Sequence, residues 1–332
     1  MPSLRIWQDG DYQLRTTDSS GCSVISKRWS VMGQPISQMA GSCPSNVLTI
    51  ESQGSNHRSI QWYRNDTLVQ SDHLNFQGGV HRGSTNYGAK GTFIDSYGNV
   101  YVADTESDRV LMFTSASTSG TVVAGGNGRG SGAHQLNRPS PIFVDSKGVL
   151  YVSDQYNHRI MAWSPGSSSG MVVAGGNGPG SGNHQLNEPY GVCMNAQGQL
   201  MISDQQNHRI VRWTPGAQTG TRILGITGLA GMAPDMLNLP AGLFLDSKGF
   251  LYIADRNNHR IQRWVSGSLF SQTVAGGNGG GSQLNQLNNP GDVFVDAYGA
   301  VYVSDYGNHR VVMWSNGIPE GQQLLGSNLV NS

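Results

Sequence analysis

Residues 142–176 read IFVDSKGVLYVSDQYNHRIMAWSPGSSSGMVVAGG, and related stretches recur along the chain at a nearly constant spacing. Apolar and polar residues alternate in its segments, and short turn-forming runs such as DSKG separate them. Such alternation is typical of half-buried strands. It predicts four strands in this stretch: Ile142–Val144, Leu150–Ser153, Arg159–Trp163 and Met171–Ala174.

The repeat is marked by one aspartate per copy, at Asp104, Asp154, Asp204, Asp255 and Asp305, so successive copies are 50, 50, 51 and 50 residues apart. Further upstream, the run Asn56-His57-Arg58 followed by Trp62 keeps the offset of Asn157-His158-Arg159 and Trp163. We count it as a sixth, degraded copy. A period of this length indicates a repeat architecture.

Four-stranded units without covering helices must bury their faces against one another, and a closed ring leaves no exposed terminal face. The sequence therefore predicts an all-β, six-bladed β-propeller of four-stranded antiparallel blades, with about 50 residues per blade. We assign it to residues 35–332, with a degenerate first blade. Residues 1–34 fit no copy and are expected to form an N-terminal extension or an edge strand.

The repeated motif itself is D-x-x-N-H-R followed by an aromatic residue, with LNxP and D-S-x-G before it. This pattern resembles the NHL repeat, strongly over residues 90–326 and weakly over 35–89. The resemblance implies a six-bladed propeller that serves mostly as a binding platform and, in some members, binds single-stranded RNA.

Residues present in every copy are expected to build the blades, because a ligand rarely has the symmetry of the ring. We assign this structural role to Asp154, Asn157, His158, Arg159 and Trp163. The repeated histidines should lie more than about 10 Å apart, because strands are about 4.8 Å apart within each blade. They therefore cannot share one metal ion, and we expect neither a metal nor a cofactor.

Residues that differ between copies are the candidates for binding. If a to d denote the strands of a copy from the axis outward, the d–a loops and the b–c turns lie on the same face. Tyrosine and arginine are common anchors of interfaces. The candidate surface on this face consists of Arg138, Tyr156, Tyr190, Arg256 and Tyr306, with Glu188 and Asp292 as counter-charges.

The chain has 21 Lys plus Arg and 21 Asp plus Glu, so its formal net charge is zero. This balance disfavours DNA and other polyanions as main partners. We predict a non-enzymatic platform that binds a protein or peptide. Single-stranded RNA binding is the alternative, and a metal-dependent propeller hydrolase or amidating lyase is a more remote one, because the inner strands are apolar and no catalytic triad is evident.

No apolar stretch is long enough for a membrane helix, and the N-terminus lacks the apolar centre of a signal peptide. The three cysteines cannot form a disulfide framework. We expect a soluble monomer, either cytoplasmic or a fragment of an extracellular protein.

Overall fold

The structure is a computed structural model that describes residues 10–17, 23–25, 29–31, 59–64, 67–71, 90–114, 117 and 119–325. The chain divides into two compact units. The first contains residues 1–82 and 114–119, and the second contains residues 83–113 and 120–332.

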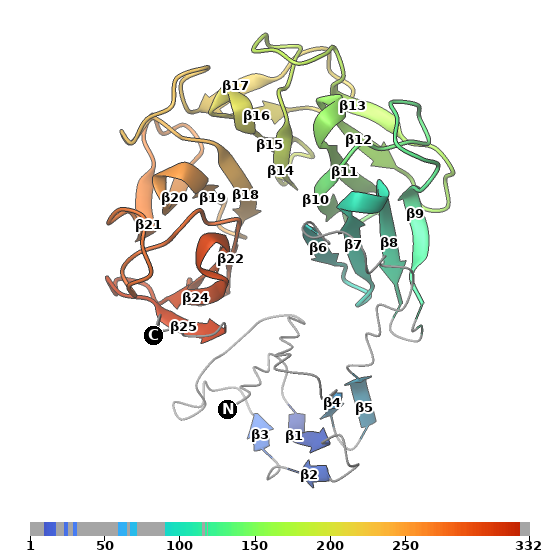
Figure 1. The fold of residues 1–332 in the computed structure, drawn as a ribbon, viewed down its shortest axis with the longest axis vertical. Coiled ribbons are helices and arrows are strands. Elements are labelled where there is room, and N and C mark those ends of the chain that lie inside the picture. The colour runs from blue at the N-terminus through green and yellow to red at the C-terminus, as the bar shows by residue number, and fades with distance from the viewer. Residues whose placement is uncertain are drawn as a thin grey trace. The chain divides into compact units, whose positions relative to one another are not determined.

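The second unit is an array of five four-stranded antiparallel sheets, each a meander in chain order (Figure 1). Each sheet is one propeller blade, numbered one to five along the chain. The strands are β6 (Gly91–Ile94), β7 (Val100–Asp104), β8 (Arg109–Phe113) and β9 (Thr121–Gly125) in blade one; β10 (Pro139–Val144), β11 (Leu150–Asp154), β12 (Arg159–Trp163) and β13 (Met171–Gly175) in blade two; β14 (Pro189–Met194), β15 (Leu200–Asp204), β16 (Arg209–Trp213) and β17 (Thr221–Leu224) in blade three; β18 (Pro240–Leu245), β19 (Phe250–Asp255), β20 (Arg260–Val265) and β21 (Gln272–Gly276) in blade four; and β22 (Asp292–Val295), β23 (Val301–Asp305), β24 (Arg310–Trp314) and β25 (Gln322–Leu325) in blade five.

The four strands predicted in residues 142–176 are confirmed as β10 to β13, with ends that differ by at most three residues. The first turn also forms as expected. Its Asp145 carboxylate accepts hydrogen bonds from the backbone N–H groups of Lys147 and Val149. Gly148 in this turn has a φ of +79°, which a residue without a Cβ adopts at little cost.

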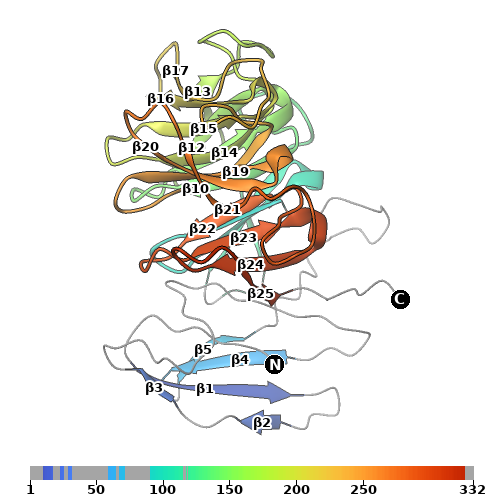
Figure 2. The ribbon, with the colours of Figure 1, turned by 90° about the vertical axis from the view of Figure 1, so that its left-hand side faces the viewer.

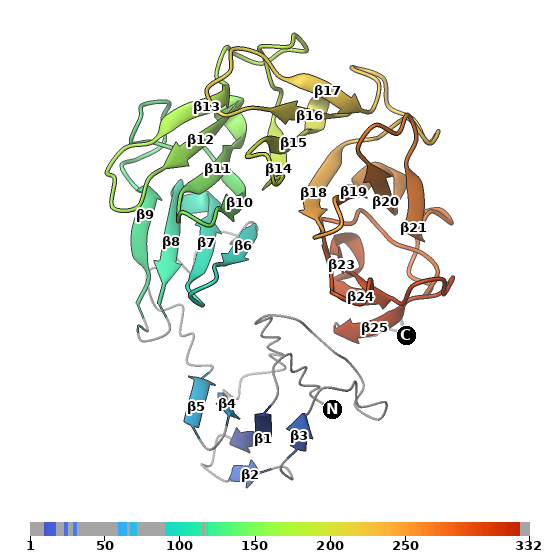
Figure 3. The same cartoon turned by 180° about the vertical axis from the view of Figure 1, so that it is seen from behind.

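Successive blades pack through their innermost strands, and Figures 1 and 3 show β6, β10, β14 and β18 on the inner side of the array. The core lies between blades. Trp163 of blade two, 2% exposed, belongs to a cluster that includes Tyr101 of blade one. Burial of a ring of this size contributes about 3 kcal/mol. The tryptophan at the end of the third strand in blades two to five therefore holds each blade to the preceding one.

The b–c turns are short 3₁₀ helices: η1 (Thr105–Ser107), η2 (Gln155–Asn157), η3 (Gln205–Asn207), η4 (Arg256–Asn258) and η5 (Tyr306–Asn308). They lie on one side of the blades (Figure 2). The Tyr156 N–H donates to the Asn137 carbonyl in the d–a loop, and the matching bond recurs from Gln206 to Asn187. The d–a loops and b–c turns therefore share one face, here called the loop face.

The predicted number of six blades is wrong, because the array has five. The part of the degraded sixth copy that the structure describes belongs to none of these five blades. Its Trp62 lies in β4 (Ser59–Arg64), which pairs with β1 (Gly10–Thr17) and β5 (Thr67–Ser71) in a separate sheet of the first unit, together with β2 (Ser23–Ile25) and β3 (Trp29–Val31).

A sequence difference accounts for this departure. Gln53 stands where the intact copies have their shared aspartate, and the run Asn56-His57-Arg58 lies outside the described residues. Without that carboxylate the copy lacks the acceptor that organises the other blades. The predicted division between residues 1–34 and 35–332 stays a prediction. Among the described residues, no helix is both long and apolar enough to cross a membrane.

Candidate functional site

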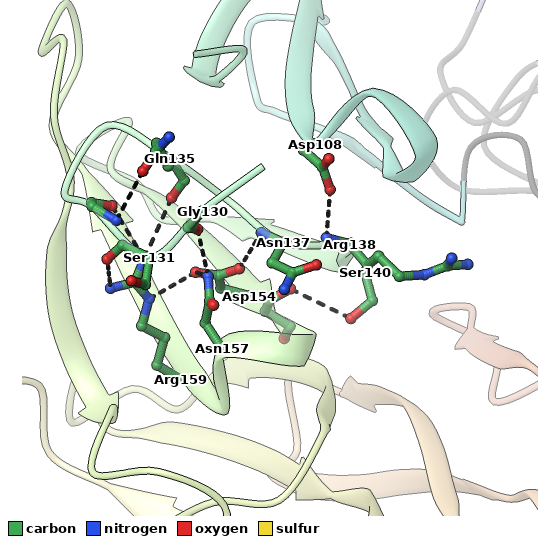
Figure 4. Close-up of polar contacts among 12 residues, drawn as sticks. Asp108, Gly130, Ser131, Gln135, Asn137, Arg138, Ser140, Asp154, Asn157 and Arg159 are labelled. Carbon is green, nitrogen blue, oxygen red and sulfur yellow. Dashed lines mark hydrogen bonds and ion pairs between the residues drawn. The ribbon is translucent and has the colours of Figure 1, made fainter. Parts of the chain in front are cut away.

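The shared aspartate of each intact blade accepts hydrogen bonds from three sides. In blade two, Asp154 Oδ2 accepts from Asn157 Nδ2 at 2.8 Å and from Arg159 Nε at 2.7 Å (Figure 4). Asp154 Oδ1 accepts from the Asn137 N–H at 2.7 Å. Because Asn137 belongs to the preceding d–a loop, one buried carboxylate joins the b–c turn, the third strand and that loop.

Asn157 and Arg159 extend this network into the same loop. Asn157 Nδ2 donates to the Gly130 carbonyl at 2.8 Å, and Arg159 Nη1 donates to the Ser131 carbonyl at 2.8 Å. Charge-assisted bonds of this kind are short and strong. The Asp–Asn–Arg cluster recurs in blades three to five, as Asp204–Asn207–Arg209, Asp255–Asn258–Arg260 and Asp305–Asn308–Arg310.

The repeated histidine has a separate role in positioning the d–a loops. His158 Nδ1 accepts a hydrogen bond from the Glu188 N–H at 3.1 Å, and His208 Nδ1 accepts one from the Leu239 N–H at the same distance. In blade one, the Asp108 carboxylate takes this place and accepts from the Arg138 N–H at 2.8 Å. A ring nitrogen accepts a hydrogen bond only when it carries no proton, so this contact requires an unprotonated Nδ1.

The residue that donates this bond has an unusual backbone conformation. Arg138, Glu188, Leu239 and Asn289 all have positive φ values between 49° and 54°. Non-glycine residues rarely adopt this region. The scaffold thus fixes the backbone at the d–a position, while the side chain there differs in every blade.

Arg138 projects from its d–a loop onto the loop face, away from the Asp–Asn–Arg cluster (Figure 4). Its guanidinium carbon lies 5.4 Å from the centre of the Tyr156 ring, and its Nη2 atom lies 3.1 Å from Glu106 Oε1. Cation–π contact and ion pair together orient the arginine. The structure thus brings together two residues of the candidate surface and adds Glu106, which the sequence did not single out.

All but one of the remaining predicted residues interact with a second arginine, Arg256, or with Tyr190; the exception is Glu188. The Arg256 guanidinium carbon lies 5.5 Å from the centre of the Tyr306 ring. Tyr190 interacts electrostatically with both residues and with Asp292. Burial raises the pKa of Tyr190 to about 12, the Asp292 carboxylate adds to this rise, and Arg256 opposes it. Tyr190 keeps its proton at neutral pH and can donate a hydrogen bond.

Asp292 begins β22 and its side chain lies against Gly242 of blade four. The surrounding protein raises the pKa of the Asp292 carboxyl to about 6, and the backbone N–H of Val293 opposes this rise. Water still reaches the residue. Asp292 is thus exposed to solvent while its side chain packs against the inner strand of blade four.

Lys90 also belongs with these residues, although the sequence analysis did not select it. It precedes β6 at the position that Ser140 occupies in blade two and Tyr190 in blade three. Burial, then Arg138 and Arg256, lower the pKa of Lys90, while Glu106 raises it. The charges of arginines from blades two and four thus act on the Lys90 ammonium.

These contacts define what we call the axial cluster, a group from all five blades at the loop-face end of the inner strands: Lys90, Glu106, Arg138, Tyr190, Arg256, Asp292 and Tyr306. Lys90 could have been recognised from the sequence, because it stands at the position of Ser140 and Tyr190 in blades two and three. Glu188 lies apart from the cluster and accepts a hydrogen bond from Gln206 Nε2 at 3.3 Å. Within the described ranges, no three His, Cys, Asp or Glu residues are grouped as metal ligands.

Cys193 follows Tyr190 in the inner strand of blade three and is 7% exposed, within the core between blades. Burial raises the pKa of the Cys193 thiol to about 12. The thiolate, which is the nucleophilic form, is therefore scarce at neutral pH.

Solved structures of low sequence identity share this fold. A chain of the nidogen/laminin complex aligns with a TM-score of 0.57 and 14% identity, over 94% of this chain and 92% of that chain. A gluconolactonase from Xanthomonas campestris aligns with a TM-score of 0.52 and 16% identity, over 71% and 74%. An auxiliary nutrient binding protein from Bacteroides ovatus aligns with a TM-score of 0.51 and 16% identity, over 76% and 63%. Similar structures thus include both an enzyme and binding proteins.

No curated protein sequence matches the chain. The family model of the NHL repeat matches residues 237–264, which run from the end of a d–a loop through the first three strands of blade four. Blades two, three and five carry the same Asp, Asn, His and Arg at the same strand positions. The matched repeat and the propeller blades together support an NHL-repeat β-propeller.

Proposed function

We propose that this protein is a non-enzymatic binding platform that holds an acidic peptide segment of a protein partner at the axial cluster. The observation that carries the proposal is that Arg138 and Arg256, from two blades, each lie over a tyrosine ring on the loop face. Lys90 stands at the start of an inner strand, and the charges of both arginines lower its pKa. Like charges repel when they are placed together. A carboxylate bound between them would relieve that repulsion and would therefore be attracted to this position.

The aromatic residues beside these cations support a peptide ligand. The rings of Tyr156 and Tyr306 lie under Arg138 and Arg256, so both guanidinium groups are oriented before a ligand arrives. Preorganised arginine and tyrosine side chains dominate the energetics of many protein interfaces. Both tyrosine rings remain about half exposed and offer apolar area to residues that flank an acidic side chain.

The acidic residues on the same face favour a peptide over a nucleic acid. Glu106 and Asp292 belong to the axial cluster, and Glu188 lies on the neighbouring d–a loop. A continuous phosphate backbone would meet these carboxylates, whereas one or two carboxylates of a peptide need only the cations. The chain of the nidogen/laminin complex has the same fold, so a partner protein is compatible with this architecture.

The test begins with selection of a random peptide library displayed on phage against the intact protein. Selected peptides should be enriched in Asp or Glu next to apolar residues. Their binding, followed by fluorescence anisotropy of labelled synthetic peptides, should weaken by about tenfold or more in Lys90→Ala/Arg256→Ala, because charge-assisted bonds are lost. Lys147→Ala is the matched control, since Lys147 lies in the turn at the opposite end of the strands.

Selected peptides without acidic residues, or equal binding by the double variant, would contradict the proposal. The same anisotropy assay with a labelled oligouridylate tests the RNA alternative. Tighter binding of this RNA than of any peptide, lost in the double variant, would replace the peptide by RNA as the ligand of the axial cluster.

A further inference from the structure

A cavity of about 380 Å³ lies between blades four and five, at their outer edge. One wall is β21, and the opposite wall is the hairpin between β24 and β25, residues Ser315–Pro319. Its volume falls in the range of about 300–1,000 Å³ that is usual for ligand pockets. The cavity is distinct from the axial cluster, with which it shares no residue.

Among the described residues, the hairpin of blade five makes no backbone hydrogen bond to β21 of blade four. Between blades two and three, the matching hairpin contacts the outer strand directly, and the Gly216 N–H donates to the Val173 carbonyl at 3.4 Å. The corresponding residues between blades four and five are Gly317 and Val274. Both line the cavity, and no hydrogen bond joins these two described residues. The matching pair between blades three and four, Gly267 and Ile223, also lacks this bond.

Blade five also has an indole donor that lacks the hydrogen-bond partner found in blades three and four. In blades three and four, Trp213 Nε1 donates to the Ala217 carbonyl and Trp264 Nε1 to the Ser268 carbonyl, both at 2.9 Å. Trp314 is the corresponding residue of blade five and is 2% exposed. Its Nε1 atom is buried without a hydrogen-bond partner, although the ring lines the cavity. A buried donor of this kind is rare and calls for an acceptor.

Arg263 supplies the charge of the cavity and is its only charged lining residue among the described ones. Its guanidinium carbon lies 5.0 Å from the centre of the Phe250 ring, and Nη2 donates to Gln272 Oε1 at 2.7 Å. These contacts hold the guanidinium group in place. The matched position in blades one and five is methionine, Met112 and Met313, so the charge is not required by the blade.

The other walls combine amides with apolar groups. Val274, Val301, Ile318 and Pro319 provide apolar surface, and Asn278 and Asn316 provide further donors. Two acidic residues, Asp246 and Asp296, line an adjoining hollow of about 100 Å³ that shares Tyr252 and Arg263. An anionic group is therefore best placed on the β21 side of Arg263, away from those carboxylates.

We propose that this cavity binds a small organic carboxylate with an apolar body. The carboxylate pairs with the Arg263 guanidinium, and the body packs against Val274, Val301 and Ile318. Guanidinium–carboxylate geometry favours such a pair, because two parallel N–H···O bonds form at once. Closure of the hairpin around the ligand brings an acceptor to the Trp314 indole N–H.

The experiment is a titration of the ¹⁵N-labelled intact chain, followed by the indole N–H resonance of Trp314, which is assigned with Trp314→Phe. The probes are acetate, phenylacetate and 4-phenylbutyrate, with phenylacetamide as the neutral counterpart. We expect a saturable shift with the two phenyl acids, and weaker binding of acetate and of the amide. Arg263→Met should weaken binding of the phenyl acids by about tenfold or more.

Arg212→Met is the matched control, because Arg212 occupies the position of Arg263 in blade three and lines no part of this cavity. It should leave the titration unchanged. The proposal is overturned if no phenyl acid gives a saturable shift, if phenylacetamide binds as tightly as phenylacetate, or if Arg263→Met binds like the unmodified chain. The comparison of acid with amide on the unmodified chain decides the question even if Arg263→Met does not fold.

Discussion

Blades one and three carry the same Asp–Arg pair in different surroundings. In blade three, Asp204 and Arg209 are 2.7 Å apart, and their side chains are 0% and 3% exposed. In blade one, Asp104 and Arg109 are 2.8 Å apart, but their side chains are 17% and 25% exposed. The two pairs have nearly the same geometry and differ in how much protein surrounds them.

Their neighbours explain the difference. Asn207 completes the Asp–Asn–Arg cluster of blade three, and the Arg209 guanidinium also donates to the Ser181 and Gly182 carbonyls of the d–a loop. Blade one has Ser107 at the asparagine position. The cluster therefore stabilises a blade by anchoring the loop before it, and the ion pair provides only part of this stabilisation.

The largest effect is expected from Asp204→Ala. It leaves the Arg209 guanidinium buried without its carboxylate, which costs about 3–5 kcal/mol of unfolding free energy. Asp104→Ala should cost about 1 kcal/mol, because water can solvate the remaining arginine. Urea unfolding of both variants measures the two values. Equal losses in the two blades would refute the view that burial and loop anchoring set the contribution of the pair.

The histidine position gives the next test. His208→Ala removes the acceptor of the Leu239 N–H and should lower the unfolding free energy by about 1–2 kcal/mol. His184 is the matched control, since it lies exposed in a d–a loop. His184→Ala should leave the unfolding free energy nearly unchanged in the same urea experiment. A loss as small for His208 as for His184 would show that the bond to Leu239 contributes little.

The chain itself suggests a subtler substitution at this position. Asp108 performs the histidine role in blade one with a φ of 51°, and His208 has a φ of 55°, so His208→Asp fits the backbone. Burial lowers the pKa of His208 below its usual 6.5. As pH falls through 6.5, the unfolded chain therefore binds a proton before the folded chain does, and stability declines. His208→Asp should remove this part of the acid sensitivity, as urea unfolding over a pH series can measure.

At neutral pH the same variant should lose less than about 1 kcal/mol, because the carboxylate still accepts from the Leu239 N–H. Asp108 also pairs with Arg129 at 3.0 Å, whereas Ala230 stands at the matching loop position of blade three. Addition of Ala230→Arg should recover the loss. If His208→Asp keeps the pH dependence of the unmodified chain, His208 is not the group responsible for it.

The sequence predicted the strands of each blade well, because their alternation and turn residues act locally. The Asp145 turn and the strands β10 to β13 illustrate this. The number of blades was not predictable in the same way. The degraded copy around Trp62 kept the spacing of an aromatic residue, but pairing with β1, a segment that fits no copy, depends on contacts far apart in sequence.

The axial cluster was predicted in part for a related reason. Position-by-position differences between blades pointed to Arg138, Tyr190, Arg256, Asp292 and Tyr306. Lys90 is found by the same comparison once it is aligned with Ser140 and Tyr190 of the next two blades. The outer cavity was not predictable, because it depends on how the hairpin of one blade packs against the next blade, which the hairpin sequence does not show.

The blades also differ at the start of the inner strand, where blades one and three have Gly91 and Gly191 and blade five has Asp292. With a pKa of about 6, Asp292 loses its negative charge as pH falls through that value. The axial cluster then becomes more positive, while peptide carboxylates stay ionised until about pH 4. Binding of the selected acidic peptides should therefore strengthen between neutral pH and about pH 5.

The gain should be less than about fivefold, because the interaction between single charges in contact with water amounts to about 1 kcal/mol. Asp292→Asn keeps the shape of the side chain against Gly242 and removes its charge. This variant should bind the peptides more tightly at neutral pH and show no further gain on acidification, as anisotropy titrations at the two pH values can measure. Because the axial cluster contains no histidine, persistence of the full pH dependence in Asp292→Asn would mean that the peptides do not bind beside Asp292.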